Sequence, residues 1–143
     1  MITPDRPRRL ADWRPRLSAY LNDVARASFR PGKHDCALFA AGAVQAMTDV
    51  DLASAYRGTY RSLAAGQEAL QSRGFADHIA FVEAVFPAVA PALAQVGDLA
   101  VMPSAVPGER GALGIFQGAG VYVLRPSGLV VADRLSVERA FSV

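Results

Sequence analysis

The single cysteine of the chain, Cys36, lies where a nucleophile could be activated. It follows His34 and Asp35 in the stretch PGKHDCALFAAGAV (residues 31–44), in which a Pro-Gly pair breaks the chain and a long apolar run begins at the cysteine. The free N–H groups and the dipole of a helix N-terminus favour a thiolate and lower the pKa of a cysteine placed there. The same pattern also fits an ordinary capped helix whose first turn holds a small buried residue.

A cysteine hydrolase also needs a histidine beside the sulfur and a third polar group that orients the imidazole. The chain has two histidines. His34 is a candidate base because residues i and i+2 share a side in an extended segment, although its ring could instead bond to the local backbone or a strand. His78, in FADHIAFVE, is expected on the surface of a helix. A metal site made of His34, Asp35 and Cys36 lacks the spread of ligands that zinc usually takes, so no metal is expected.

Two kinds of periodicity define the elements that would position these residues. A 3.6-residue apolar period predicts helices, and a period of two from Gly97 onward predicts short strands bounded by Gly and Pro. The expected helices cover residues 10–28, 36–47, 62–72 and 76–86, with Asp35 as the N-cap of the second helix. The expected strands are GDLAVMP (97–103), ALGIFQG (112–118), GVYVLRP (120–126) and GLVVADR (128–134), the last two joined as a hairpin. Helices followed by an antiparallel meander define an α+β fold.

The length of 143 residues fits one domain, residues 1–143. We expect an N-terminal helical arm over residues 1–30, helices with the Asp-Cys pair over 35–86, and antiparallel strands over 97–135. The helix that begins at Cys36 is apolar nearly all round and rich in alanine, which predicts a central position against the sheet.

Charge and composition exclude several functions. A formal net charge of +2 and the lack of a basic stripe alternating with aromatics argue against nucleic acid as a partner. The first 13 residues have no apolar stretch behind their charges, so no signal peptide is expected, and the apolar segment 79–97 is interrupted by Glu83, Pro87 and Pro91, so no membrane insertion is expected. The glycines of GALGIFQGAG (111–120) lie between strands with no helix to receive a phosphate, so we expect no nucleotide cofactor, and indeed no cofactor.

A polar aromatic cluster, YRGTYRS (residues 56–62), provides candidate interaction residues: Tyr56, Arg57, Tyr60 and Arg61. Tyr and Arg are favoured at protein interfaces, but the same side chains could cover one end of the core. Asp98, which follows a glycine at a strand start, is expected to bond to the neighbouring turn.

The order of these motifs resembles the papain-like cell-wall cysteine peptidases of the NlpC type. Those proteins have an Asp-Cys pair at a helix start, a Gly-Asp-hydrophobic strand and then a strand of the form His-Val-Gly-Ile-Tyr-x-Gly, matched here by DC (35–36), GDLAVM (97–102) and ALGIFQGAGVYV (112–123). The sequence is closer still to a small uncharacterised family with a His-Asp-Cys motif from the tail gene clusters of phages and gene-transfer particles. The resemblance covers residues 30–143 and implies a papain-like fold with Cys36 at the nucleophile position.

The resemblance fails at the other catalytic positions. Ala112 occupies the position of the base histidine, and the position of the orienting polar residue falls near Leu124. Neither side chain can exchange a proton, and the members of such a catalytic unit are strongly non-additive. A thiol without its base keeps only what the helix N-terminus provides.

Two hypotheses follow. In the first, the chain is a catalytically inactive peptidase-like domain, a virion component of a phage-like tail tip or hub that is assembled in the host cytoplasm and contacts other tail-tip or hub proteins. In the second, it is an active cysteine peptidase or amidase that cleaves peptidoglycan during DNA entry, with Cys36 as nucleophile and His34 as base. The missing base histidine favours the first.

Overall fold

Side-chain caps define where three of the four helices begin. The computed structural model describes residues 3–104, 107 and 110–143. Asp35, Ser62 and Asp77 each accept a hydrogen bond from the backbone N–H three residues later, which satisfies one of the free donors of a first turn. The helices are α1 (Trp13–Val24), α2 (Cys36–Thr48), α3 (Leu63–Ser72) and α4 (His78–Val85). The predicted positions of α2 and of its N-cap Asp35 are confirmed.

The N-terminal arm is helical over a shorter range than expected. We predicted a helix over residues 10–28, whereas α1 covers only Trp13–Val24. The preceding segment lies against the end of α2, where the N–H of Leu10 donates to the carbonyl of Met47 at 2.8 Å. A hydrogen bond to another element takes the place of helix continuation, although the apolar period alone runs on through Leu10.

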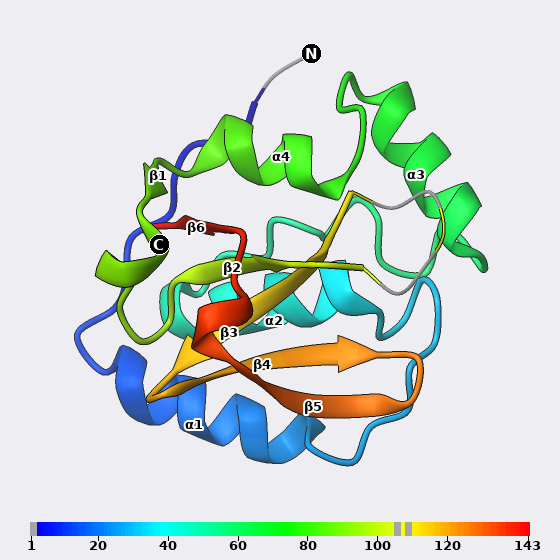
Figure 1. The fold of residues 1–143 in the computed structure, drawn as a ribbon. Coiled ribbons are helices and arrows are strands. Elements are labelled where there is room, and N and C mark those ends of the chain that lie inside the picture. Colours follow the sequence, from blue (N-terminus) through cyan, green and yellow to red (C-terminus); the bar gives the residue numbers. More distant parts are fainter. Residues whose placement is uncertain (1–2, 105–106, 108–109) are drawn as a thin grey trace.

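The strands form one six-stranded antiparallel sheet, so the predicted α+β class is confirmed (Figure 1). Its order is β1-β6-β2-β3-β4-β5, and the predicted meander corresponds to β2 through β5. The prediction that the sheet is confined to residues 97–135 is wrong, because β1 and β6 complete one side of it. These two strands have two and three residues, too few to show an alternating pattern. The strands are β1 (Ala88–Val89), β2 (Leu99–Met102), β3 (Ala112–Gln117), β4 (Gly120–Arg125), β5 (Gly128–Asp133) and β6 (Arg139–Phe141), with short 3-10 turns at Pro91–Leu93 and Arg134–Ser136.

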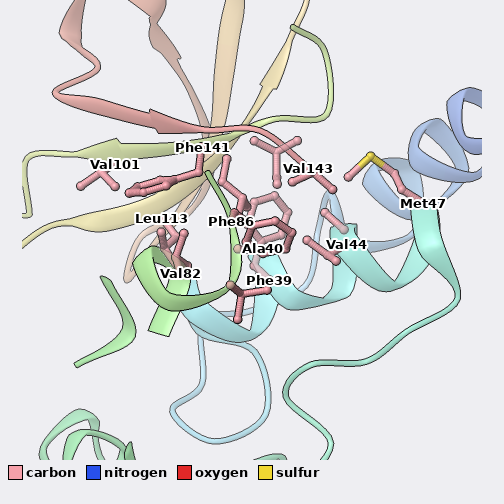
Figure 2. Packing of buried hydrophobic residues seen from close by; sticks show 14 of the residues in the cluster. Phe39, Ala40, Val44, Met47, Val82, Phe86, Val101, Leu113, Phe141 and Val143 are labelled. Carbon is pink, nitrogen blue, oxygen red and sulfur yellow. The ribbon is translucent and has the colours of Figure 1, made fainter. Parts of the chain in front are cut away.

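The central strands β2 and β3 are buried on both faces of the sheet. Helix α2 packs between α1 and strands β3 and β4, and Figure 2 shows its Phe39 and Val44 among side chains from α4 and the sheet such as Leu113 and Phe141. Alternate residues of the same strands form a second apolar cluster on the other face, which includes Met102. Because both faces are covered, the central strands are continuous apolar runs, as the sequence GDLAVM already showed.

A buried ion pair connects the N-terminal arm to the start of β2. The Arg9 guanidinium lies 2.8 Å from the carboxylate of Asp98, which is almost fully buried, and also donates to the backbone carbonyls of Val96 and Val143. The other carboxylate oxygen of Asp98 accepts from the N–H of Gln95 at 2.8 Å. The expectation that Asp98 bonds to its neighbouring turn is therefore confirmed.

Within the residues that the structure describes, every helix is too short or too polar to cross a membrane.

Candidate functional site

Cys36 is the first residue of α2 and is 6% exposed. It belongs to the same apolar cluster as Met102 and Ala112, and it also lines a pocket. The prediction that Cys36 lies in the first turn of a buried helix packed on an antiparallel sheet is confirmed.

The Asp35 carboxylate holds together the segments around this helix start. One oxygen accepts from the N–H of Leu38 at 2.9 Å, and the other accepts from the N–H of Gly32 at 3.1 Å and from the hydroxyl of Tyr60 at 2.5 Å. Three donors thus neutralise the cost of burying a carboxylate. Asp35 is both the helix cap and the anchor of a chain segment 25 residues away.

Tyr60 packs closely against two glycines, its ring against Gly66 and its carbonyl against Gly32. A Cβ at Gly66 would come within 2.9 Å of the Tyr60 ring, and a Cβ at Gly32 would overlap the Tyr60 carbonyl. Gly32 also has a φ of +82°, a conformation that favours glycine. Burial, followed by the neighbouring charge of Asp35, raises the pKa of Tyr60, so its hydroxyl keeps its proton to a higher pH than that of an exposed tyrosine.

His34 lies beside this network but is not among the described residues that line the pocket. Its backbone forms an isolated bridge with Arg30, and its ring meets Phe39 edge-on, with centroids 6.2 Å apart. Its Nε2 is buried without a hydrogen-bond partner, and burial lowers the pKa of the imidazole. The alternative to a catalytic role is that the His34 ring bonds to the local backbone or to a strand. The main chain of His34 does bond to Arg30, but the Nε2 of its ring has no such bond.

The pocket that contains Cys36 has a volume of about 380 Å³ and lies between helices α2, α3 and α4 and strands β2 and β3. Its lining is mainly apolar, from side chains such as Leu38, Val44, Leu70, Phe81 and Leu113. The polar lining residues include Asp35, Tyr56, Tyr60, Gln67, Asp77, His78 and Arg110. A mainly apolar pocket with a few polar groups is the usual form of a binding site.

His78 is the histidine that shares this pocket with Cys36. The expectation of an exposed helix-surface histidine is wrong, because His78 is half-buried and its Nε2 lies 2.6 Å from the carbonyl oxygen of Gly111. A carbonyl only accepts, so Nε2 carries the proton in the neutral ring and Nδ1 keeps the lone pair. The contact spans 33 residues, and no local pattern around His78 could have indicated it.

An ion-pair cluster closes the side of the pocket next to His78. Arg110 donates to both carboxylate oxygens of Asp77 at 2.8 Å and to Glu83 at 3.0 Å. These hydrogen bonds from Arg110 are the main reason why the pKa of Asp77 is lowered. Glu83 also lies 3.4 Å from Arg139, so two arginines and two carboxylates balance each other in this cluster.

The predicted cluster of interaction residues divides into two groups. Tyr56 and Tyr60 form part of the pocket wall, which agrees with the alternative that they cover one end of the core. Arg57 pairs with Asp51 at 2.8 Å, and Arg61 is exposed. Of the four, only Arg61 has a side chain that is fully available at the surface.

The two positions that the resemblance assigns to a base and an orienting group are both apolar and buried. Ala112 is the first residue of β3 and belongs to the same buried cluster as Cys36. Leu124 lies in the main core between the sheet and the helices. Among the described residues, no three His, Cys, Asp or Glu side chains are grouped so that they could hold a metal ion.

Comparison with known families gives a match over most of the sequence. A family described as a domain of unknown function, DUF6950, matches residues 8–143, and the chain belongs to it. No curated protein matches the sequence significantly.

Proposed function

We propose that the chain is a catalytically inactive papain-like domain of the NlpC type that acts as a structural component of a phage-like tail tip or hub. The observation that carries this proposal is the occupant of the base position. Cys36 begins a buried helix that packs on an antiparallel sheet, while Ala112 occupies the same buried cluster as the cysteine. A methyl group cannot accept a proton, so the residue at the position where the resemblance places the base cannot act as one.

The polar groups around Cys36 support a structural role. The Asp35 carboxylate is engaged by three donors, and Tyr60 is held by Asp35, so both side chains stabilise the helix start. A domain of this kind contributes surfaces to an assembly with other tail-tip or hub proteins and needs no turnover. Its location would be the tail of the virion, after assembly in the host cytoplasm.

An active cysteine peptidase or amidase that cleaves peptidoglycan is the second candidate, and one observation favours it. His78 lines the same pocket as Cys36, which His34 does not. In the neutral ring, the Nδ1 of His78 could accept a thiol proton because Nε2 is bound to the Gly111 carbonyl. If the chain is an enzyme, His78 is therefore a further candidate for the base besides His34.

Release of muropeptides from purified peptidoglycan separates the two candidates. We expect no release of muropeptides by the wild type. We expect Cys36→Ala to fold with a loss of only about 1 kcal/mol in the free energy of unfolding, and to assemble as the wild type does. Release by the wild type that is abolished in Cys36→Ala and in His78→Ala, but kept in His34→Ala, would establish the hydrolase. Release abolished by His34→Ala would identify His34 as the base instead.

Mass spectrometry of purified particles tests the structural role separately. The chain should be present in intact phage-like particles, and particles assembled with Cys36→Ala should contain the same amount. If the chain is absent from purified particles, the proposal of a tail component fails even if no hydrolysis is found.

A further inference from the structure

Strand β5 forms one margin of the sheet. It is the last strand in the sheet order, and all six of its residues pair with β4 in an uninterrupted register (Figure 1). In the part of the chain that the structure describes, no other strand pairs with its outer edge. An edge of this kind presents unpaired backbone N–H and C=O groups that can bond to a further strand.

The two margins of the sheet differ in how they are protected. At the other margin, β1 has only two residues and lies between Pro87 and Pro91, and short strands and prolines both prevent strand addition. In β5, the segment Leu129–Ala132 contains neither a charge nor a proline nor a bulge. Val131 is 63% exposed in the middle of this strand. An unblocked edge with an exposed apolar side chain is expected to be covered.

We infer that β5 pairs with β5 of a second copy of this chain, antiparallel and about a two-fold axis, so that the two sheets become one. A two-fold axis perpendicular to the sheet keeps the same face of both copies on the same side of the joined sheet. Residues that lie opposite each other across the axis must therefore point to the same face. Only registers that place residues of equal parity opposite each other satisfy this condition. The residue that lies on the two-fold axis, opposite its own copy, is therefore Val130 or one of its neighbours, Leu129 and Val131.

The side chains select the register centred on Val130. Here Val130 lies opposite its own copy, and the exposed Val131 lies opposite the Leu129 of the second copy, so that apolar side chains face each other over residues 129–131. A register centred on Val131 would place Leu129 opposite the charged Asp133, and one centred on Leu129 would place the exposed Val131 opposite Ser127. The strand is thus complementary to itself in one register, which is why the second copy and not an unrelated strand is the expected occupant. This inference does not depend on the proposed function.

Sedimentation equilibrium of the purified chain over a range of concentrations tests the inference. We expect a reversible dimer for the wild type and at least about tenfold weaker dimerisation for Val131→Lys, because the ammonium group would lie against an apolar neighbour. Val131 is exposed in the single chain, so a lysine there should leave the fold intact, which circular dichroism would verify. Leu93→Lys is the matched control, since Leu93 is 70% exposed but lies in the turn after β1, and this variant should dimerise as the wild type does.

Hydrogen exchange of the wild type provides a second measurement that does not rely on a variant. Amides of residues 128–133 should exchange more slowly at a concentration at which the dimer forms than at one at which it dissociates. A wild type that stays monomeric at all concentrations would overturn the inference. So would a dimer that persists in Val131→Lys, or one without added protection of residues 128–133, because the contact would then lie elsewhere.

Discussion

Tyr60→Phe measures how strongly the Asp35 carboxylate stabilises the start of α2. The substitution removes the 2.5 Å hydrogen bond to Asp35 but keeps the ring that lies against Gly66. A hydrogen bond to a charged group contributes about 1.5–3 kcal/mol, and Asp35 keeps two backbone donors. We therefore expect a loss of about 1–2 kcal/mol in the free energy of unfolding, measured by urea denaturation.

A double-mutant cycle isolates this interaction from the helix cap. Asp35→Ala should cost more, about 3 kcal/mol or above, because the N-cap is lost and the donors of Gly32 and Tyr60 are left unsatisfied. In the Asp35→Ala background, Tyr60→Phe should cost nearly nothing, which gives a coupling energy of about 1–2 kcal/mol. A coupling energy below about 0.5 kcal/mol would refute the reasoning, because the two side chains would then act independently.

The same pair predicts how stability changes in alkali. Burial and Asp35 raise the pKa of Tyr60 above its ordinary value of 10, so the unfolded chain loses this proton at lower pH than the folded chain. The contribution of Tyr60 to stability is therefore complete below pH 10 and is lost as the pH rises through the folded-state pKa. Tyr60→Phe should reduce the steepness of this loss by up to about 1.4 kcal/mol per pH unit. Equal slopes for the variant and the wild type above pH 10 would contradict the assignment.

Three further substitutions test other contacts, each by urea denaturation. Arg9→Met should cost about 3–5 kcal/mol, because it leaves the buried carboxylate of Asp98 without its cation; a loss below 1 kcal/mol would show that solvent replaces the arginine. Gly32→Ala should cost at least about 2 kcal/mol from its positive φ and the overlap with the Tyr60 carbonyl, whereas an unchanged midpoint would mean that the turn can relax. His34→Phe should keep or slightly raise stability at neutral pH, because it removes a buried ring nitrogen that has no hydrogen-bond partner. Burial lowers the pKa of His34, so protonation of the unfolded chain reduces the stability of the wild type as the pH falls below 6.5, and the variant should not show this loss. A clear loss at neutral pH would reveal a role for the imidazole.

Local features of the sequence were sufficient to predict α2, its cap and the meander. Asp35 and Cys36 are adjacent to the apolar run that they begin, and each strand of the meander is bounded by its own Gly or Pro, so the signal and the structure lie in the same few residues. The bond between Asp98 and its own turn could be predicted for the same reason, because the donor, the N–H of Gln95, is three residues away.

The pocket could not be predicted in this way. His78 was expected to be exposed because the residues around it form an ordinary helix start, and its contact with Gly111 depends on how α4 packs near β3. The bond between Tyr60 and Asp35 is equally non-local. Side chains that act once, across a large sequence separation, leave no periodic pattern, so only the packed structure brings them together.

The place of β6 in the sheet has a consequence for how the chain reaches its folded state. Strands β2 to β5 pair with their neighbours in sequence, so their hairpins can close early, whereas β6 must return across the meander to pair with β2 and β1. Among the described strands, β1 pairs only with β6 and so joins the sheet last. Until then the fully apolar edge of β2 is open to other chains. We therefore expect the chain to be most prone to aggregation while residues 99–102 are available and residues 139–141 have not yet paired with them.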